Sequence, residues 1–199
     1  MGSFNEFLDV RRSTMIGMIS ILIFATLNLT AIFIDGDWRP SMMICELGRS
    51  DVTFVSILFT INCAISGIGM ILCGYGILKE EVRQMVCISY IMIMCIGTFL
   101  IFVGLFDMNT DVHAGYAFAV AFILGTSLVT MIADDILQHR YVLVACIVVI
   151  LLILGAVLLT APQYSQSMSL FSMLAWWFVR LVLTNRTEDV LVRNSRILP

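Results

Sequence analysis

Residues 52–78 read VTFVSILFTINCAISGIGMILCGYGIL and contain no aspartate, glutamate, lysine or arginine. This apolar run is longer than the roughly 20 residues that a helix needs to cross a bilayer. A soluble core helix must also present a polar face to water, whereas a helix surrounded by hydrocarbon need not. The stretch therefore predicts a transmembrane helix.

Five more apolar runs occur in the chain, at 13–34, 82–106, 112–133, 142–161 and 167–183. The 199 residues are 60% hydrophobic and only 13% charged, whereas soluble domains are about a quarter charged. The runs lack the alternation of a barrel strand, and their short connections make consecutive helices antiparallel neighbours. We therefore predict an all-α integral membrane protein, with a single domain over residues 1–199 that forms a bundle of six transmembrane helices.

The basic residues predict the orientation of this bundle. Only Arg39 and Arg49 lie in the loop 35–51, whereas the other nine basic residues flank or end helices on the opposite side. Because cytoplasmic loops are enriched in lysine and arginine, both termini are expected in the cytoplasm. The loop 35–51 is then the outer loop, and residues 184–199 form a cytoplasmic tail. The net charge of −3, without a basic cluster, argues against a nucleic-acid partner.

Ionisable residues are absent from the middle of the predicted bundle, which disfavours a proton-coupled pump. Asp134 and Asp135 fall at the cytoplasmic end of the fourth helix. Arg180, about one turn from the end of the sixth, is expected to snorkel to the membrane surface. His113 and His139 stand at opposite ends of the fourth helix and are too far apart to share a metal ion. We predict no metal site, no cofactor and no catalytic constellation.

Small and polar residues within the apolar runs predict how the helices pack. Ala117, Ala121 and Gly125 follow His113 at four-residue intervals and indicate a helix-packing stripe. The glycines between 67 and 76 are expected to allow close approach of a neighbouring helix. Asn28 and Asn62 are expected to form hydrogen bonds between helices, although a polar lining for a lipid or substrate pocket is the alternative.

The cysteines and the tryptophans of the chain each allow two interpretations. Five of the six cysteines lie inside apolar runs, which favours packing over disulfides. Cys45 lies in the outer loop, where pairing with another chain is the minority interpretation. Trp176 and Trp177 lie in the middle of the sixth run, although tryptophan favours membrane interfaces. Either this helix is shifted or the pair faces a partner.

Two short stretches resemble the DRAM-like family of six-helix membrane proteins. One is ICELG at 44–48, which leads to Asn62; the other is GLF at 104–106, followed by His113, Gly115 and Phe122. The resemblance spans most of the chain. It departs from the family where Cys45-Glu46 replaces Ser-Asp, and where residues 167–169 replace the Glu-Trp that usually precedes the last helix.

The family includes damage-regulated autophagy modulators and a Golgi factor for remodelling lipid anchors. The resemblance therefore implies a membrane-trafficking or autophagy role in an endomembrane (lysosome or Golgi) or the plasma membrane. It implies no catalytic residues. It does imply an outer-face cluster of Glu46, Gly48, Asn62 and His113, in which Glu46 and His113 are expected within about 6 Å, close enough for their charges to couple.

The leading functional hypothesis is a non-enzymatic membrane protein that binds lipid or a membrane-protein partner, as an accessory subunit or homo-oligomer. One alternative is a small-solute transporter or channel component, with Asn28, Asn62, Ser66 and Thr98 along its path. The other is a lipid-modifying enzyme in which His113 and Glu46 act as acid and base at the outer interface.

Overall fold

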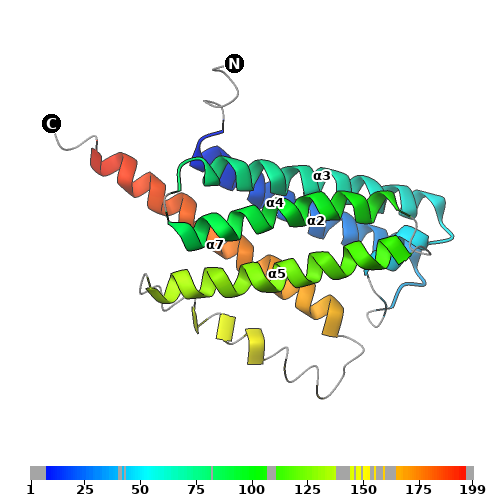
Figure 1. The fold of residues 1–199 in the computed structure, drawn as a ribbon. Helices are drawn as coiled ribbons and strands as arrows, with labels where there is room; N and C mark the ends of the chain where they lie inside the picture. Colours follow the sequence, from blue (N-terminus) through cyan, green and yellow to red (C-terminus); the bar gives the residue numbers. More distant parts are fainter. Residues whose placement is uncertain are drawn as a thin grey trace.

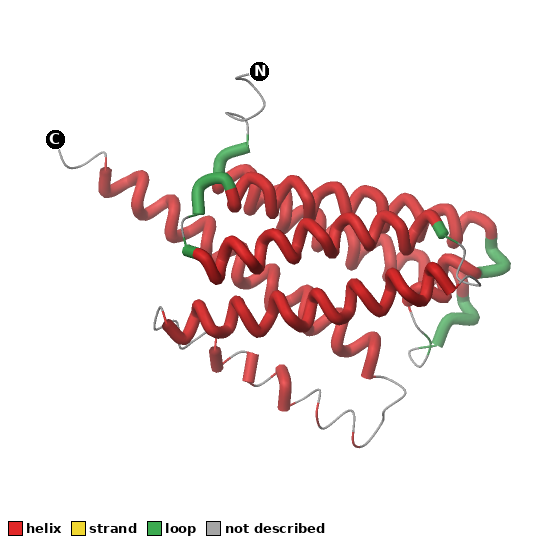
Figure 2. Tube along the Cα trace, in the orientation of Figure 1, coloured by secondary structure: helices red, strands yellow, loops and turns green. Residues whose placement is uncertain are grey.

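The computed structural model describes residues 8–39, 42, 44–81, 83–106 and 111–137, nine positions between 144 and 159, and residues 165–195. They form the helices α2 (Val10–Asp35), α3 (Thr53–Leu78), α4 (Gln84–Leu105), α5 (Asp111–Leu137) and α7 (Ser165–Ser195), with a short 3-10 helix, η1 (Ile44–Arg49). No strand occurs in this part of the chain, so the all-α prediction is confirmed (Figure 2). The predicted run 142–161 lies mostly outside the described residues.

The long helices lie side by side in one bundle (Figure 1). Helices α2, α3, α4 and α5 pack against one another in chain order, and α7 packs against α2. We call the end of the bundle where α2 and α4 begin the basal end. The opposite end, where η1 lies, is the loop end (Figure 1).

Three of these helices, α2, α3 and α4, are long and apolar enough to cross a membrane. The distribution of their apolar and polar side chains is the reverse of that in a soluble bundle. Along α3, Ile57, Ile61, Ile65 and Ile68 are between 45% and 52% exposed, while Asn62 is buried. Apolar side chains outside and polar or small ones inside suit a hydrocarbon surrounding. The helices thus support a membrane protein, while the six-span count and the orientation stay predictions.

Small residues bring α2, α3 and α4 close together. At the interface of α3 with α4, a Cβ atom placed on Gly97 would lie 2.5 Å from the carbonyl oxygen of Gly67. At the interface of α2 with α3, a Cβ atom on Gly17 would lie 2.5 Å from the sulfur of Cys73. The glycines of α3 face neighbouring helices at similarly short range, which confirms their predicted role in close packing: Gly67, Gly69, Gly74 and Gly76.

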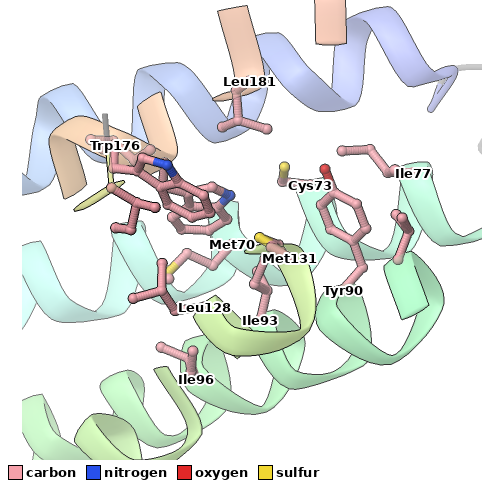
Figure 3. Packing of buried hydrophobic residues seen from close by; sticks show 14 residues of the cluster. Met70, Cys73, Ile77, Tyr90, Ile93, Ile96, Leu128, Met131, Trp176 and Leu181 are labelled. Atoms are coloured by element: carbon pink, nitrogen blue, oxygen red, sulfur yellow. The ribbon is translucent and has the colours of Figure 1, made fainter. Parts of the chain in front are cut away.

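The larger apolar core lies in the basal half of the bundle. Trp176 and Trp177 of α7 are each only 4% exposed and pack against Leu128 and Met131 of α5. Figure 3 shows Trp176, Leu128 and Met131 gathered in the same interior, with Ile93 of α4 beside them. The tryptophan pair therefore belongs to the core of this chain.

The described cysteines carry free thiols, namely Cys45, Cys63, Cys73, Cys87 and Cys95. Cys63 and Cys73 are completely buried in the two apolar cores. The prediction that the cysteines of the apolar runs are packing residues is confirmed for these two, whereas Cys87 is half-buried and Cys95 is exposed.

Helix α7 is much longer than the predicted run 167–183. Its 31 residues from Ser165 to Ser195 correspond to about 46 Å at the usual rise of an α-helix. The helix continues through most of the predicted tail, and its C-terminal part projects beyond the rest of the bundle (Figure 1). Arg180 consequently lies in the middle of the helix, half a helix length from its end.

Candidate functional site: an apolar cavity above a buried ionic network

The outer-loop residues of the predicted cluster pack on the start of α3. Helix η1 carries Glu46 and Gly48, both half-buried. The hydroxyl of Ser56 donates a hydrogen bond to the carbonyl oxygen of Gly48 at 2.7 Å. A Cβ atom on Gly48 would lie 3.0 Å from the ring of Phe59, so glycine allows η1 to approach α3 closely. Burial raises the pKa of the neighbouring Cys45 thiol, with a smaller contribution from Glu46.

Asn62 has a structural role deeper in the bundle. Its side-chain nitrogen donates to the carbonyl oxygen of Phe24 on α2 at 3.1 Å. The helix rise places it about 9 Å further along α3 than Ser56, the residue that holds Gly48. The predicted hydrogen bond between helices is confirmed for Asn62. It is wrong for Asn28, whose fully buried amide makes no hydrogen bond with the described residues.

The remaining predicted residues are only partly described. The side chains of His113, Ala117 and Ala121 lie outside the described set, so the 6 Å separation of Glu46 from His113 stays a prediction. No described atom lies within 4 Å of a Cβ atom placed on Gly125. The described residues contain no group of three potential metal ligands.

The main convergence of charge is at the basal end, where sequence reasoning did not place it. Asp134 and Asp135, near the end of α5, have side chains that are 4% and 1% exposed. Arg180 of α7, 3% exposed, forms ion pairs with both of them, at 3.5 Å to Asp134. Arg83, in the loop before α4, bonds Asp134 at 3.0 Å from the other side. We call Glu81, Arg83, Asp134, Asp135 and Arg180 the basal network.

Arg83 connects the basal network to the surface. Two of its nitrogens bond the carboxylate of Glu81, at 3.0 and 2.8 Å. These hydrogen bonds, together with the charges of Asp134 and Glu81, raise the pKa of Arg83. The guanidinium therefore stays charged at any ordinary pH. The network ties the basal ends of α4 and α5 to the middle of α7.

The predicted snorkelling of Arg180 is wrong. Arg180 is buried in the bundle because it pairs with Asp134 and Asp135, and α7 continues beyond it to Ser195. Its guanidinium also lies 5.8 Å from the ring centre of Trp176 and interacts with Tyr90. An intramembrane arginine is normally held by acidic partners. The pair Asp134-Asp135 at the same level of the bundle was the sequence signal that could have identified them.

An apolar cavity of about 50 Å³ lies in the bundle between α2 and α7. All five long helices line it, and its wall is almost entirely carbon. Its lining residues are Ser20, Ile21, Phe24, Ser66, Met70, Leu100, Val120, Leu124, Leu170, Met173, Leu174 and Trp177. We call it the central cavity. A smaller cavity of about 20 Å³ lies beside it and shares Leu124, Met173 and Trp177 with it.

The chemistry of the central cavity is simple. Its two hydroxyls already donate hydrogen bonds, Ser20 to the carbonyl oxygen of Ile16 at 2.7 Å and Ser66 to Asn62 at 3.3 Å. The indole nitrogen of Trp177 has no hydrogen-bond partner among the described residues, but it is itself buried and offers almost no surface to the cavity. Such a wall suits an apolar molecule and offers no charged group for a polar solute. Sequence reasoning missed this site because its residues come from five helices and share no motif.

Comparisons of the chain with protein-family models, with curated proteins and with solved structures find no match. The site must therefore be interpreted from its own geometry.

Proposed function

We propose that this chain is a non-enzymatic multi-pass membrane protein that binds a lipid inside its helix bundle. The observation that carries the proposal is the central cavity, because ligand sites in helix bundles are typically apolar spaces between helices with few polar groups. Lipid is the apolar molecule available at high concentration to a protein with helices of this kind. The cavity is small, so it would hold only part of a lipid and the remainder would extend from it.

The finer parts of the proposal rest on the sequence. Six membrane spans with both termini in the cytoplasm agree with the distribution of arginine and lysine. The resemblance to the DRAM-like family suggests an accessory or regulatory role in membrane trafficking or autophagy, in an endomembrane or the plasma membrane. Binding of a membrane-protein partner belongs to the same proposal, with the bound lipid as a regulator of that contact.

The apolar wall argues against the transporter alternative. Asn62 and Ser66 bond each other, and Asn62 also bonds α2. Thr98 lies exposed on the outside of α4 and bonds its own helix, donating to the carbonyl oxygen of Met94 at 3.0 Å. These side chains hold helices together or face outward, so they do not form a polar path.

A pair of matched substitutions on α5 tests the proposal. Val120 lines the central cavity, whereas Val129 is 64% exposed on the outside of the bundle. Val120→Phe is expected to fill the cavity with a ring, and Val129→Phe adds the same ring outside it. Native mass spectrometry of protein released from lipid nanodiscs measures the retained lipid.

We expect the wild type and Val129→Phe to keep a bound lipid that Val120→Phe loses. The proposal is overturned if the wild type carries no lipid, or if Val120→Phe retains as much as Val129→Phe. Melting curves of the two variants in the same detergent show whether both are folded.

A further inference from the structure

The central cavity offers a ligand almost no polar contact. Both hydroxyl groups of its wall donate hydrogen bonds inside the bundle, Ser20 to its own helix and Ser66 to Asn62. The described lining contains no charged side chain. A phosphate, carboxylate or ester head group that moved from the membrane surface into this cavity would lose hydrogen bonds without replacing them, which is costly. The part of a lipid that suits the cavity is therefore hydrocarbon.

The volume of the cavity distinguishes between the kinds of hydrocarbon that lipids contain. Apolar protein cavities that take up a benzene ring measure about 150 Å³, whereas the central cavity measures about 50 Å³. A sterol or another fused-ring lipid is too wide for this space. A single straight chain is narrower and can place its last few carbon atoms there. Filling the cavity in this way restores van der Waals contacts that an empty space forfeits.

The cavity also lies at the depth where lipid chains end. Ser66 lies 13 residues into α3, a helix of 26 residues, which is about 20 Å from the start of the helix. Phe24 lies 14 residues into α2, which has the same length. The wall is thus in the middle of two helices that are long enough to cross a membrane. The hydrocarbon core of a bilayer is about 30 Å thick, and the chains of its two leaflets end near its middle.

The seam between α5 and α7 is the side of the cavity that the described residues close least. Within this part of the chain, α5 packs mainly against α4, and α7 packs mainly against α2. Val120 of α5 and Trp177 of α7 both line the cavity. The smaller cavity lies along the same seam, because its wall includes Leu128 of α5 and Trp176 of α7. A chain that enters between α5 and α7 reaches the central cavity without separating a closely packed pair of helices.

We propose that the central cavity binds the methyl end of one straight hydrocarbon chain, which enters between α5 and α7 while the head group of the lipid stays outside the bundle. This inference rests on the proposed function and adds the chemical class of the lipid and the part of it that is bound. Straight-chain acyl and alkyl lipids belong to this class, whereas sterols do not.

Three photoactivatable phospholipids test the inference with the full-length protein in nanodiscs. All three have the same head group and the same chain length. The end probe carries a diazirine near the methyl end of one chain, and the head probe carries it next to the head group. The ring probe resembles the end probe, but its chain ends in a cyclohexyl ring. Mass spectrometry identifies the residues that each probe labels.

In the wild type, we expect only the end probe to label the cavity wall, at residues such as Leu124 and Trp177. The head probe and the ring probe should label the outside of the bundle alone. Val120→Phe should lose the labelling of the wall by the end probe because the added ring fills the cavity. Val129→Phe should keep this labelling because Val129 is exposed on the outside.

A larger cavity should accept the ring probe. Phe24 lines the cavity and is 7% exposed, whereas Phe59 is 4% exposed and does not belong to the described lining. Phe24→Ala removes a ring from the wall, so the ring probe should then label the cavity. Phe59→Ala is the matched control and should leave the cavity closed to this probe. Melting curves show which variants fold, and the wild-type comparison decides the inference if Phe24→Ala does not.

Three results would overturn the inference: the head probe or the ring probe labels the wild-type cavity as strongly as the end probe does, or Phe59→Ala admits the ring probe as readily as Phe24→Ala. The lipid-binding proposal survives each of them as long as native mass spectrometry finds lipid in the wild type and none in Val120→Phe. An unlabelled cavity in a wild type that retains lipid would overturn this inference alone. If no probe labels the cavity and the wild type carries no lipid, both proposals fail.

Discussion

Two buried asparagines on facing helices differ in whether their amides are bonded. Asn62 donates to α2, whereas the amide of Asn28 has no partner among the described residues. Replacing a bonded amide removes an interaction that contributes about 1 kcal/mol within a membrane bundle. Removing an unbonded one relieves a desolvation cost.

We therefore expect Asn62→Leu to lower the free energy of unfolding by about 1 kcal/mol and Asn28→Leu to leave it unchanged or raise it. Denaturant titration in mixed micelles measures both variants under one condition. A larger loss of stability in Asn28→Leu than in Asn62→Leu would show that the two roles are assigned the wrong way round.

Arg180 is the residue with the largest predicted effect on stability. Arg180→Met removes the guanidinium that forms the buried ion pair with Asp135, and breaking a buried pair in this way typically costs about 3–5 kcal/mol. Replacing both partners, in Arg180→Met with Asp135→Leu, should restore much of this loss because both members of the buried ion pair are then removed. Thermal unfolding of the two variants gives the comparison.

The control is Arg12→Met, which breaks the exposed pair with Asp9, whose side chains are 52% and 49% exposed. Exposed pairs contribute little to stability, so its melting temperature should remain close to that of the wild type. If Arg180→Met also has the melting temperature of the wild type, the basal network does not contribute to the stability of the fold as its burial implies.

At the scale of the elements, the contact between α3 and α4 depends on two glycines. Gly67 and Gly97 face each other so closely that neither helix leaves room for a side chain there. Gly97→Val should force the helices apart and lower the free energy of unfolding by about 1–3 kcal/mol, as overpacking usually does. Gly125→Val makes the same change in α5, where no described atom lies within 4 Å of the added Cβ.

Denaturant titration distinguishes the two glycine variants, and Gly125→Val should be tolerated. Equal losses of stability would mean that intrinsic helix propensity, and not close packing, explains the result. A large loss in Gly125→Val alone would instead support the predicted packing stripe on α5.

Single elements also show where sequence reasoning succeeds and where it fails. The apolar runs predicted α2, α3 and α4 to within three residues at each end, because hydrophobic length is a local property. The predicted end of α7 was wrong by twelve residues, because the last turns of this helix contain charged residues and are therefore not part of an apolar run. The position of Arg180 along its helix depended on that boundary, whereas its burial depends on the two aspartates of α5.

At the scale of the whole molecule, the all-helical fold and the apolar exterior could be predicted, but the site could not. The outer-face cluster came from short motifs, and one of its members, Asn62, proves to bond another helix. The central cavity is made by side chains from five helices, and only their packing determines that it exists. Composition likewise suggested an uncharged interior, whereas the packed helices bury a charged network at the basal end.

The basal network and the central cavity lie at neighbouring levels of the bundle. The basal network holds the ends of α4 and α5 against the middle of α7, and one turn of α7 separates Arg180 from Trp177 in the cavity wall. A lipid in the cavity would therefore bind next to helices that the ion pairs of the basal network already hold in place. This arrangement favours a lipid that stays bound in the cavity over a solute that passes through the bundle.

A density map of the protein in nanodiscs, at a resolution that shows lipid, tests the central claim most directly. We predict an elongated density that enters the central cavity between Val120 and Trp177. An empty or collapsed cavity, in a map that resolves lipids around the outside of the same helices, would contradict the account.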